Sequence, residues 1–178
     1  MAVWILLLRG INVGGAGRLS MADLRRLLVD LGCRHVSTLI QSGNAAFASD
    51  MPKGDLIASI SEVIDARHGF RPKAILLTAG DLRAALAASP FPEAAGDPKP
   101  MHLFFHDPQV RPDASALNAL RTEGEEWADI DGVLYLRAPA GIGRSKLAAA
   151  IGRQLKDATA RNLDTCQKLL RLAESVPD

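Results

Sequence analysis

The sequence predicts an α+β fold made of two similar halves, each with the order βαββαβ followed by a helix. Apolar runs of strand length alternate with segments of helical periodicity, and the same order occurs twice. One proline-rich stretch, residues 89–100, separates the two series. At the same step of each half, TAGDL (78–82) and TARNL (159–163) share three of five letters. We therefore expect two domains, residues 1–98 and 99–178, related by internal duplication.

The elements of the first half follow from local signals. Residues 3–9 form an uninterrupted apolar run that glycines end, which is typical of a central strand. Ser20 begins a helix whose apolar residues recur at helical spacing as far as Leu31, and Gly32 ends it. The other elements expected in this half are strands at 35–40, 44–48 and 74–77 and helices at 53–68 and 78–88.

The second half repeats this order. Asp131-Gly132 between two apolar runs is a strong signal for a two-residue hairpin turn. The expected elements are a strand at 101–106, a helix at 113–120, hairpin strands at 127–130 and 133–136, a helix at 145–155, a short strand near 158 and a helix through 163–172. Because βαββαβ is the order of the ferredoxin-like, or alpha-beta, plait, we expect each half to be an antiparallel sheet with helices on one face.

Charge narrows the functional classes. A net charge of +1 over 178 residues is too close to neutrality for a globally basic nucleic-acid binder. The charge is nevertheless uneven, because residues 81–131 have four basic and ten acidic residues and residues 132–171 have eight basic and two acidic ones. The eight aromatic residues do not form a paired stacking platform, which disfavours sequence-specific RNA binding by a sheet. Of these segments, only the basic residues 132–171 could attract anions.

Cysteine usage indicates the compartment. Cys33 and Cys166 are too few and too far apart for a disulfide framework or a zinc motif, which favours a reducing environment. The first apolar run lacks a basic flank and a cleavage site, and it is much shorter than a membrane span. We therefore expect a cytoplasmic protein without membrane association.

His102 and His106 share one face of a strand, but without a third ligand they predict no metal site. Exposed sheet edges would permit a homodimer.

Glycine, arginine and amide side chains cluster where plait topology brings segments together. In the first half, the end of the first strand and the turn between the second and third strands meet at one rim of the sheet. In the second half, the third and fourth strands end at the opposite rim. The predicted ligand-binding residues are Arg9, Asn12, Gly14, Gly15, Gln41, Ser42 and Asn44 at the first rim, and Arg144, Ser145, Lys146, Arg161 and Asn162 at the second.

These residue types are suited to an anion. Glycines let backbone amides approach a phosphate, helix N-termini favour negative charge, and arginine forms paired hydrogen bonds to phosphate. If the halves pack antiparallel, the two rims would form one groove for a phosphate-bearing small molecule, such as a nucleotide, or for a nucleic-acid backbone. The glycine loop, residues 10–17, fits neither the G-x-G-x-x-G nor the P-loop pattern. The sequence identifies no cofactor and no catalytic residue.

Two other functions remain open. An enzyme of phosphoryl or phosphodiester transfer could use the same groove, with Arg9, Lys146 and Arg161 stabilising charge, although no general base or metal cage stands out. In a structural or protein-interaction module, Arg9 would form a salt bridge between the halves, and Asn44 and Asn162 would cap turns and helices. We favour ligand binding, because cationic side chains at a helix start oppose the helix dipole and are better explained by a bound anion.

Four ordered sequence blocks also resemble a known family. Residues 7–15 (LLRGINVGG), 41–44 (QSGN), 141–147 (GIGRSKL) and 159–162 (TARN) are similar to the signature blocks of the bacterial domain of unknown function 1697 family. Phe47 and Thr165 extend the similarity after the second and fourth blocks. The resemblance spans nearly the whole chain and implies a pair of ferredoxin-like halves. It supplies no catalytic residue.

The chain departs from that family pattern at two places. A lysine or asparagine is frequent where Ala16 and Gly17 stand, and a tryptophan is usual where Leu163 stands. If the first position holds an anion in the family, this chain would have to rely on Arg18 instead.

Overall fold

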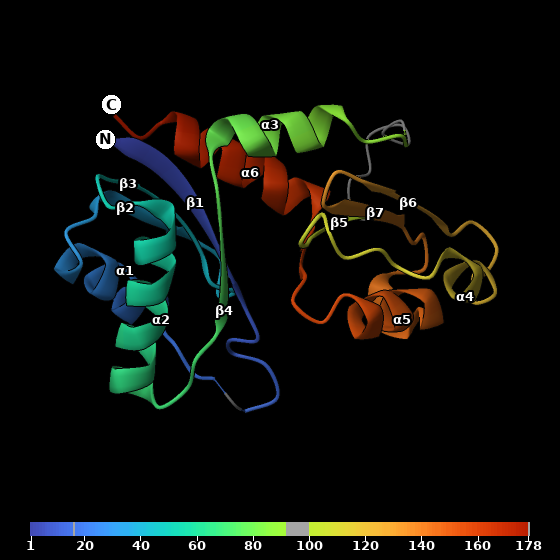
Figure 1. Cartoon of the computed structure of the whole chain (residues 1–178), viewed down its shortest axis with the longest axis horizontal. Coiled ribbons are helices and arrows are strands. Elements are labelled where there is room, and N and C mark those ends of the chain that lie inside the picture. The colour runs from blue at the N-terminus through green and yellow to red at the C-terminus, as the bar shows by residue number, and fades with distance from the viewer. Residues whose placement is uncertain (16, 92–99, 178) are drawn as a thin grey trace. The chain divides into compact units, whose positions relative to one another are not determined.

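The structure, a computed structural model, describes residues 1–15, 17–91 and 100–177. These residues form two four-stranded antiparallel sheets and six α-helices, a mixed α/β architecture compatible with two similar halves (Figure 1). The chain divides into two compact units. Unit 1 comprises Met1–Ala84 and Gln167–Asp178, and unit 2 comprises Ala85–Cys166. The domain boundary expected between residues 98 and 99 lies outside the described residues.

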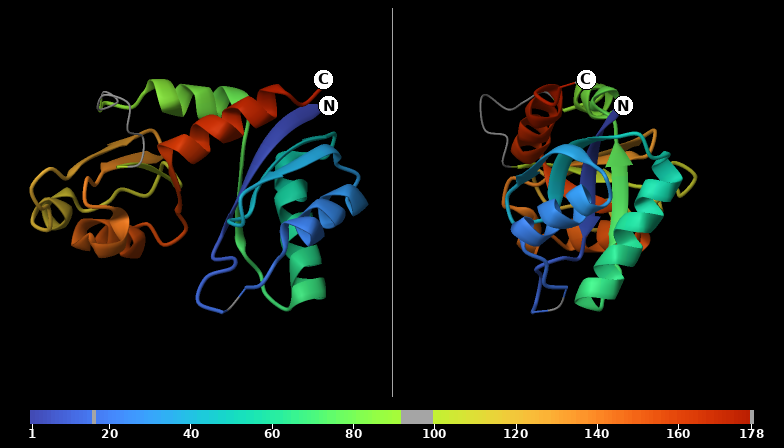
Figure 2. Two further views of the ribbon diagram at one scale, coloured as in Figure 1. Left: turned by 180° about the vertical axis from the view of Figure 1, so that it is seen from behind. Right: turned by 90° about the vertical axis from the view of Figure 1, so that its left-hand side faces the viewer.

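Unit 1 is built around its first strand. Its elements are β1 (Ala2–Arg9), α1 (Met21–Asp30), β2 (Arg34–Leu39), β3 (Asn44–Ser49), α2 (Lys53–His68) and β4 (Lys73–Leu77). The strand order is β2-β3-β1-β4, and α1 and α2 cover one face of the sheet (Figures 1 and 2). Ile5, Leu6, Leu7 and Leu8 of β1 are all fully buried, so both faces of this strand are covered. This explains why its sequence is continuously apolar and not alternating.

The ends of the helices in unit 1 follow the predicted signals. Ser20 is the N-cap of α1, and its hydroxyl oxygen accepts a hydrogen bond from the backbone N of Asp23 at 3.0 Å. Gly69 ends α2 in the left-handed conformation, with φ of 73°. The core between helices and sheet contains Leu6, Leu8, Leu24, Leu27, Leu28, Phe47, Leu56, Ile60, Ile64 and Leu76, all at most 1% exposed.

Unit 2 contains the second sheet. Its elements are β5 (Met101–Phe105), α4 (Ala114–Asn118), β6 (Glu126–Ile130), β7 (Val133–Arg137), α5 (Lys146–Gln154) and β8 (Thr159–Asn162). The strand order is β6-β7-β5-β8. Asp131 and Gly132 have φ of 48° and 84°, which are the positive values that the predicted two-residue hairpin turn requires. Phe104, Leu117, Leu134, Leu147 and Ile151 belong to one buried cluster, which joins the sheet to α4 and α5.

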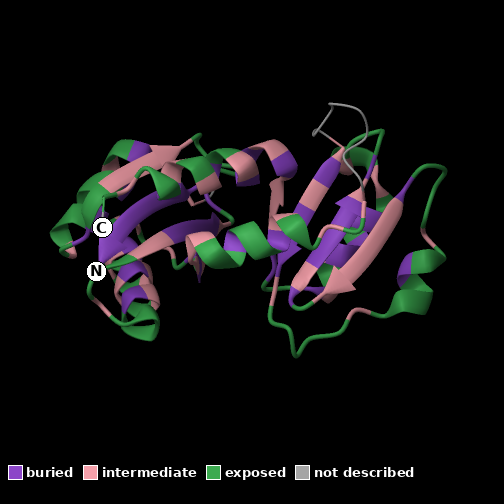
Figure 3. Cartoon of the chain, turned by 90° about the horizontal axis from the view of Figure 1, so that it is seen from above, coloured by how far each residue is buried: buried purple, intermediate pink, exposed green. Residues whose placement is uncertain are grey.

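Two further helices, α3 (Ala79–Ala87) and α6 (Leu163–Glu174), begin in one unit and end in the other. Within unit 1, an ion pair of 2.6 Å between Arg83 Nη2 and Glu174 Oε1 joins α3 to α6. Within unit 2, the hydroxyl of Tyr135 donates a hydrogen bond of 2.7 Å to the carbonyl oxygen of Ala85. Burial is greatest in β1, β3, β5 and β7, and the helices carry both buried and exposed residues (Figure 3).

Some elements differ from the sequence-based expectation. The register of β2 against β3 shifts between Arg34 and Ser37, and His35 between them has φ of 53°, which indicates a β-bulge. The helix expected at 113–120 is only five residues long as α4, and a 3-10 helix at Ile142–Arg144 was not predicted. Within the described residues, no helix combines the length and apolarity needed to cross a membrane.

Candidate functional site

The rim of unit 1 where β1 ends brings together the glycine loop, residues 10–17, and the β2–β3 turn. The backbone N of Leu8 donates a hydrogen bond of 2.9 Å to the carbonyl oxygen of Gly43 in that turn. The backbone N of Asn12 donates to the carbonyl oxygen of Gly17, also at 2.9 Å, and this bond closes the loop on itself. Sheet topology therefore places the two segments beside each other, as the sequence led us to expect.

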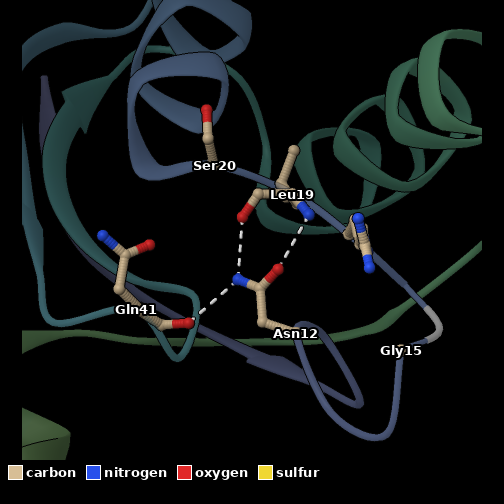
Figure 4. Close-up of a pocket in the computed structure, with 6 residues that line it drawn as sticks. Asn12, Gly15, Leu19, Ser20 and Gln41 are labelled. Carbon is tan, nitrogen blue, oxygen red and sulfur yellow. Dashed lines mark hydrogen bonds between the residues drawn. The ribbon is translucent and has the colours of Figure 1, made fainter.

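Asn12 joins three segments of this rim (Figure 4). Its Nδ2 donates hydrogen bonds to the carbonyl oxygens of Leu19, at 2.8 Å, and Gln41, at 2.9 Å. Its Oδ1 accepts a hydrogen bond of 3.0 Å from the backbone N of Leu19. Asn12 has φ of 54°, a left-handed conformation that asparagine tolerates better than most residues. Because both amide hydrogens are engaged, Asn12 positions the rim and has no donor left for an anion.

A pocket of about 480 Å³ opens at this rim. It is lined by Asn12, Gly15, Arg18, Leu19, Ser20 and Gln41. Three of these six, Asn12, Gly15 and Gln41, were predicted as ligand-binding residues. Arg18 is exposed and forms no hydrogen bond or ion pair with any residue that the structure describes. The pocket therefore has one guanidinium that is available to a ligand.

The N-terminus of α1 is partly neutralised by its own chain. The hydroxyl of Ser20 donates a hydrogen bond of 2.7 Å to Asp23 Oδ2 and accepts one from the backbone N of Asp23. This places a carboxylate in the first turn, where it interacts favourably with the helix dipole and would repel a bound anion. An anion in the pocket would consequently depend on Arg18 more than on the helix.

The glycines of the loop have two different roles. Gly14 and Gly15 have φ of 61° and 81°, and an added Cβ would meet no atom within 4 Å at either position. Gly17 also has positive φ, and its added Cβ would lie 2.7 Å from the carbonyl oxygen of Gly10. Conformation alone therefore requires Gly14 and Gly15, which leaves their exposed backbone accessible. Gly17 is required by a close backbone contact as well.

Four predicted residues of this rim do not line the pocket, namely Arg9, Gly14, Ser42 and Asn44. Asn44 is fully buried, and its Nδ2 donates to Ser42 Oγ at 2.8 Å and to the carbonyl oxygen of Leu39 at 3.2 Å. These contacts close the β2–β3 turn, which is the role that the structural alternative assigns to Asn44. Arg9 is half-buried, and strand alternation places it on the sheet face opposite Leu8. Its Nη1 is buried without a hydrogen-bond partner, and no salt bridge joins it to a described residue.

At the predicted rim of unit 2, the carboxylate of Glu125 from the same unit accepts a hydrogen bond. Met101 pairs with Arg137 and His102 pairs with Asn162, so β7 and β8 end at the same edge of the sheet. Ser145 caps α5 and donates a hydrogen bond of 2.5 Å to Glu125 Oε1. Arg144 and Lys146, which flank this cap, are both exposed. The hydroxyl of Ser145, which was predicted to contact a ligand, thus already donates its hydrogen to the carboxylate of Glu125.

Arg161 and Asn162 have structural contacts in unit 2. Asn162 Oδ1 accepts a hydrogen bond of 2.8 Å from the backbone N of Thr165 at the start of α6. Arg161 is half-buried and donates from Nη1 to the carbonyl oxygen of Ala160 at 2.8 Å. Burial lowers the pKa of Arg161 to about 10, and the nearby thiol of Cys166 opposes this shift. Burial raises the pKa of Cys166 to about 12.

The lowered pKa of Glu125 predicts that the protein loses stability at acidic pH. Burial would raise its pKa, but hydrogen bonds from Ser145 and Thr122 and the charge of Arg121 outweigh burial and lower it below 4.5. A carboxylate whose pKa is lower in the folded state than in the unfolded state stabilises the protein at every pH above its unfolded-state pKa. This contribution is lost as the pH falls through the folded-state pKa. We expect Glu125→Gln to lower the free energy of unfolding at pH 7 by about 1–2 kcal/mol.

Urea unfolding of both proteins between pH 7 and pH 3 measures this effect. The difference between wild type and Glu125→Gln should shrink as the pH falls below about 4.5. Glu123→Gln, at an exposed position, is the matched control and should follow the wild-type curve. A difference that stays constant down to pH 3 would show that Glu125 contributes through packing and not through its charge.

Arg18 stood outside the predicted set of ligand-binding residues and was named in the sequence only as a substitute for the cation missing at Ala16 and Gly17. The signal was present, because Arg18 is the single cation between the glycine loop and the N-cap of α1. Ser20 was assigned only as a cap, and Leu19 contributes backbone atoms that no sequence pattern identifies. Among the described residues, no group of three or more His, Cys, Asp and Glu side chains is placed to hold a metal ion.

Comparisons with known proteins agree with the resemblance seen in the sequence blocks. A family model with the description "Protein of unknown function (DUF1697)" matches residues 1–135, which include the whole pocket. A comparison with curated proteins found no match. The chain is similar to the solved structure of the conserved bacterial protein SP0830 from Streptococcus pneumoniae. The two share 26% sequence identity with a TM-score of 0.73, over 96% of this chain and 98% of that chain.

Proposed function

The chain belongs to the DUF1697 family of proteins of unknown function, and on that premise we propose that unit 1 binds a phosphate-bearing ligand in its rim pocket. The observation that supports this best is the exposed guanidinium of Arg18, which lines a pocket of about 480 Å³ together with the exposed backbone of Gly15. An exposed arginine without a protein partner contributes little to folding stability. Its planar guanidinium can donate two parallel hydrogen bonds to one phosphate group.

Three finer expectations accompany this proposal. Each half is a ferredoxin-like plait, which the strand orders β2-β3-β1-β4 and β6-β7-β5-β8 support. The protein works in the cytoplasm, which the free thiols of Cys33 and Cys166 support. A nucleotide or a nucleic-acid backbone would offer the pocket the same phosphate chemistry.

The contacts available to a phosphate set its expected affinity. A charge-assisted hydrogen bond contributes about 1.5–3 kcal/mol, and a helix N-terminus about 0.3–1 kcal/mol. The carboxylate of Asp23 reduces the second contribution. Binding of a simple phosphate in the millimolar range follows, since 1 mM corresponds to about 4 kcal/mol. The ligand must therefore be tested at millimolar concentration and low ionic strength.

Transfer chemistry is not part of the proposed function. Of the described residues that line the pocket, none is a carboxylate, histidine, cysteine or lysine. The guanidinium of Arg18 carries hydrogen-bond donors and no acceptor, so it offers a ligand donors only. Binding without turnover is the function that the pocket supports.

Thermal unfolding with methyl phosphate tests the proposal. At ten times the dissociation constant, the ligand should stabilise the wild type by about 1.4 kcal/mol, a rise in Tm of roughly 3–6 °C. Added salt should reduce the shift, because the guanidinium is exposed. Arg18→Gln should lose the shift. Arg26→Gln removes the same charge from an exposed position on α1 outside the pocket and should keep it. Equal shifts in the two variants, or none in the wild type, would overturn the proposal.

A further inference from the structure

Two exposed apolar residues are the chain neighbours of residues that line the rim pocket. Val13 is 68% exposed in the glycine loop, and Ile40 is 56% exposed in the β2–β3 turn. Val13 follows Asn12 and Ile40 precedes Gln41, and the hydrogen bond from Asn12 Nδ2 to the carbonyl oxygen of Gln41 ties these neighbours together. Asn12 and Gln41 both line the pocket with Arg18, so Val13 and Ile40 are each the immediate chain neighbour of a lining residue.

The backbone at Ile40 adds an independent observation. Ile40 has φ of 50°, which is an outlier for a β-branched residue because Cβ and its branches crowd the backbone there. Glycine or asparagine would adopt this conformation more easily. The side chain of Ile40 also gains little from burial within the protein, since more than half of it is exposed. Both its conformation and its exposure are unfavourable for folding, so folding does not explain its presence at this rim.

The pocket is larger than a phosphate group requires. Its volume of about 480 Å³ lies in the range that organic ligands occupy in proteins. Arg18 provides a point of attachment for one anionic group, and the remaining volume leaves room for an organic part of the ligand. Pockets of this kind hold ligands through apolar contacts, with a few polar groups that fix the orientation.

We propose that Val13 and Ile40 form the contact surface for an apolar or aromatic group carried by the ligand. The ligand is then a phosphate monoester with a hydrophobic organic part, such as an aryl phosphate, and not inorganic phosphate or a small polar ester. This inference rests on the proposed function, because the phosphate bound at Arg18 is what places the organic group against the two side chains.

A pair of monoesters with the same charge tests this inference. Titration calorimetry would compare phenyl phosphate with methyl phosphate on the full-length wild-type protein. Phenyl phosphate should bind about tenfold more tightly, the gain expected from covering on the order of 60 Å² of apolar surface. Val13→Ser and Ile40→Gly should each reduce this preference by about threefold without weakening methyl phosphate. The Ile40→Gly protein, free of ligand, should also unfold at a higher temperature than the wild type.

The controls separate this inference from the proposed function. Val29→Ser changes a comparably exposed valine, 57% accessible on α1, and should leave the preference for phenyl phosphate intact. Equal affinity of the wild type for both esters would overturn the inference and leave phosphate binding standing. A preference that survives in both Val13→Ser and Ile40→Gly would overturn it in the same way. Failure of both esters to bind would overturn the proposed function together with the inference.

Discussion

Gly43→Ala is expected to lower the free energy of unfolding by about 2–4 kcal/mol. Gly43 is buried in the β2–β3 turn, immediately before β3, with φ of 74°, where an L side chain is strained. Its added Cβ would lie 2.7 Å from Leu8 Cβ and from Ile11 Cδ1. Ile11 could shift its terminal methyl group, but Leu8 Cβ is fixed to the backbone of the central strand. Urea unfolding measures the loss directly.

Gly54→Ala is the matched control for this substitution. Gly54 lies in the first turn of α2 without positive φ, and an added Cβ would meet nothing within 4 Å. Alanine there should stabilise the protein by about 0.5–1 kcal/mol. The two substitutions add the same methyl group and are expected to have opposite signs. A neutral Gly43→Ala would mean that the loop and the turn are not held together as described.

Asn12→Asp is expected to have the second largest effect, a loss of about 2–3 kcal/mol. The substitution replaces Nδ2, which donates to the carbonyl oxygens of Leu19 and Gln41, with a carboxylate oxygen that faces both of them. Two donors are lost and a repulsive contact is created. The same variant should lose the stabilisation by methyl phosphate, because the rim is no longer fixed and carries a new negative charge. Chemical unfolding at pH 7 measures the first effect and thermal shift the second.

Asn12→Gly separates the hydrogen bonds from the backbone conformation. Glycine accepts the φ of 54° without strain but makes none of the side-chain bonds. We expect a loss of about 1–2 kcal/mol, smaller than the loss for Asn12→Asp. Equal losses for the two variants would show that the facing carbonyl oxygens do not sense the carboxylate, contrary to the hydrogen-bond pattern.

Sequence predicted best where one local signal decides the structure. The continuous apolar run of β1, the helix at 53–68 ended by Gly69, and the Asp131-Gly132 turn each follow from their own residues. The bulge at His35 and the 3-10 helix at Ile142–Arg144 have weaker local signals. They depend on how neighbouring segments pair and pack, which the periodicity of one segment does not contain.

The proximity of the glycine loop to the β2–β3 turn was predictable from the sequence, but the side-chain contacts there were not. Plait topology predicts that the glycine loop lies beside the β2–β3 turn, and the hydrogen bond from Asn12 to Gln41 joins these segments. Hydrogen bonds between residues distant in the chain, such as that from Asn12 to Gln41, then decided which side chains are occupied. The same holds in unit 2, where the bond from Ser145 to Glu125 spans twenty positions of sequence. The predicted groove shared by both rims stays a prediction.

The most direct test of ligand binding at the rim of unit 1 is a proton–nitrogen NMR titration with methyl phosphate. The account predicts saturable shifts centred on the backbone amides of Gly15 and Ser20 and the side-chain amide of Gln41, and their loss in Arg18→Gln. Shifts centred on residues 144–146, or no saturable shifts at millimolar phosphate ester, would contradict it.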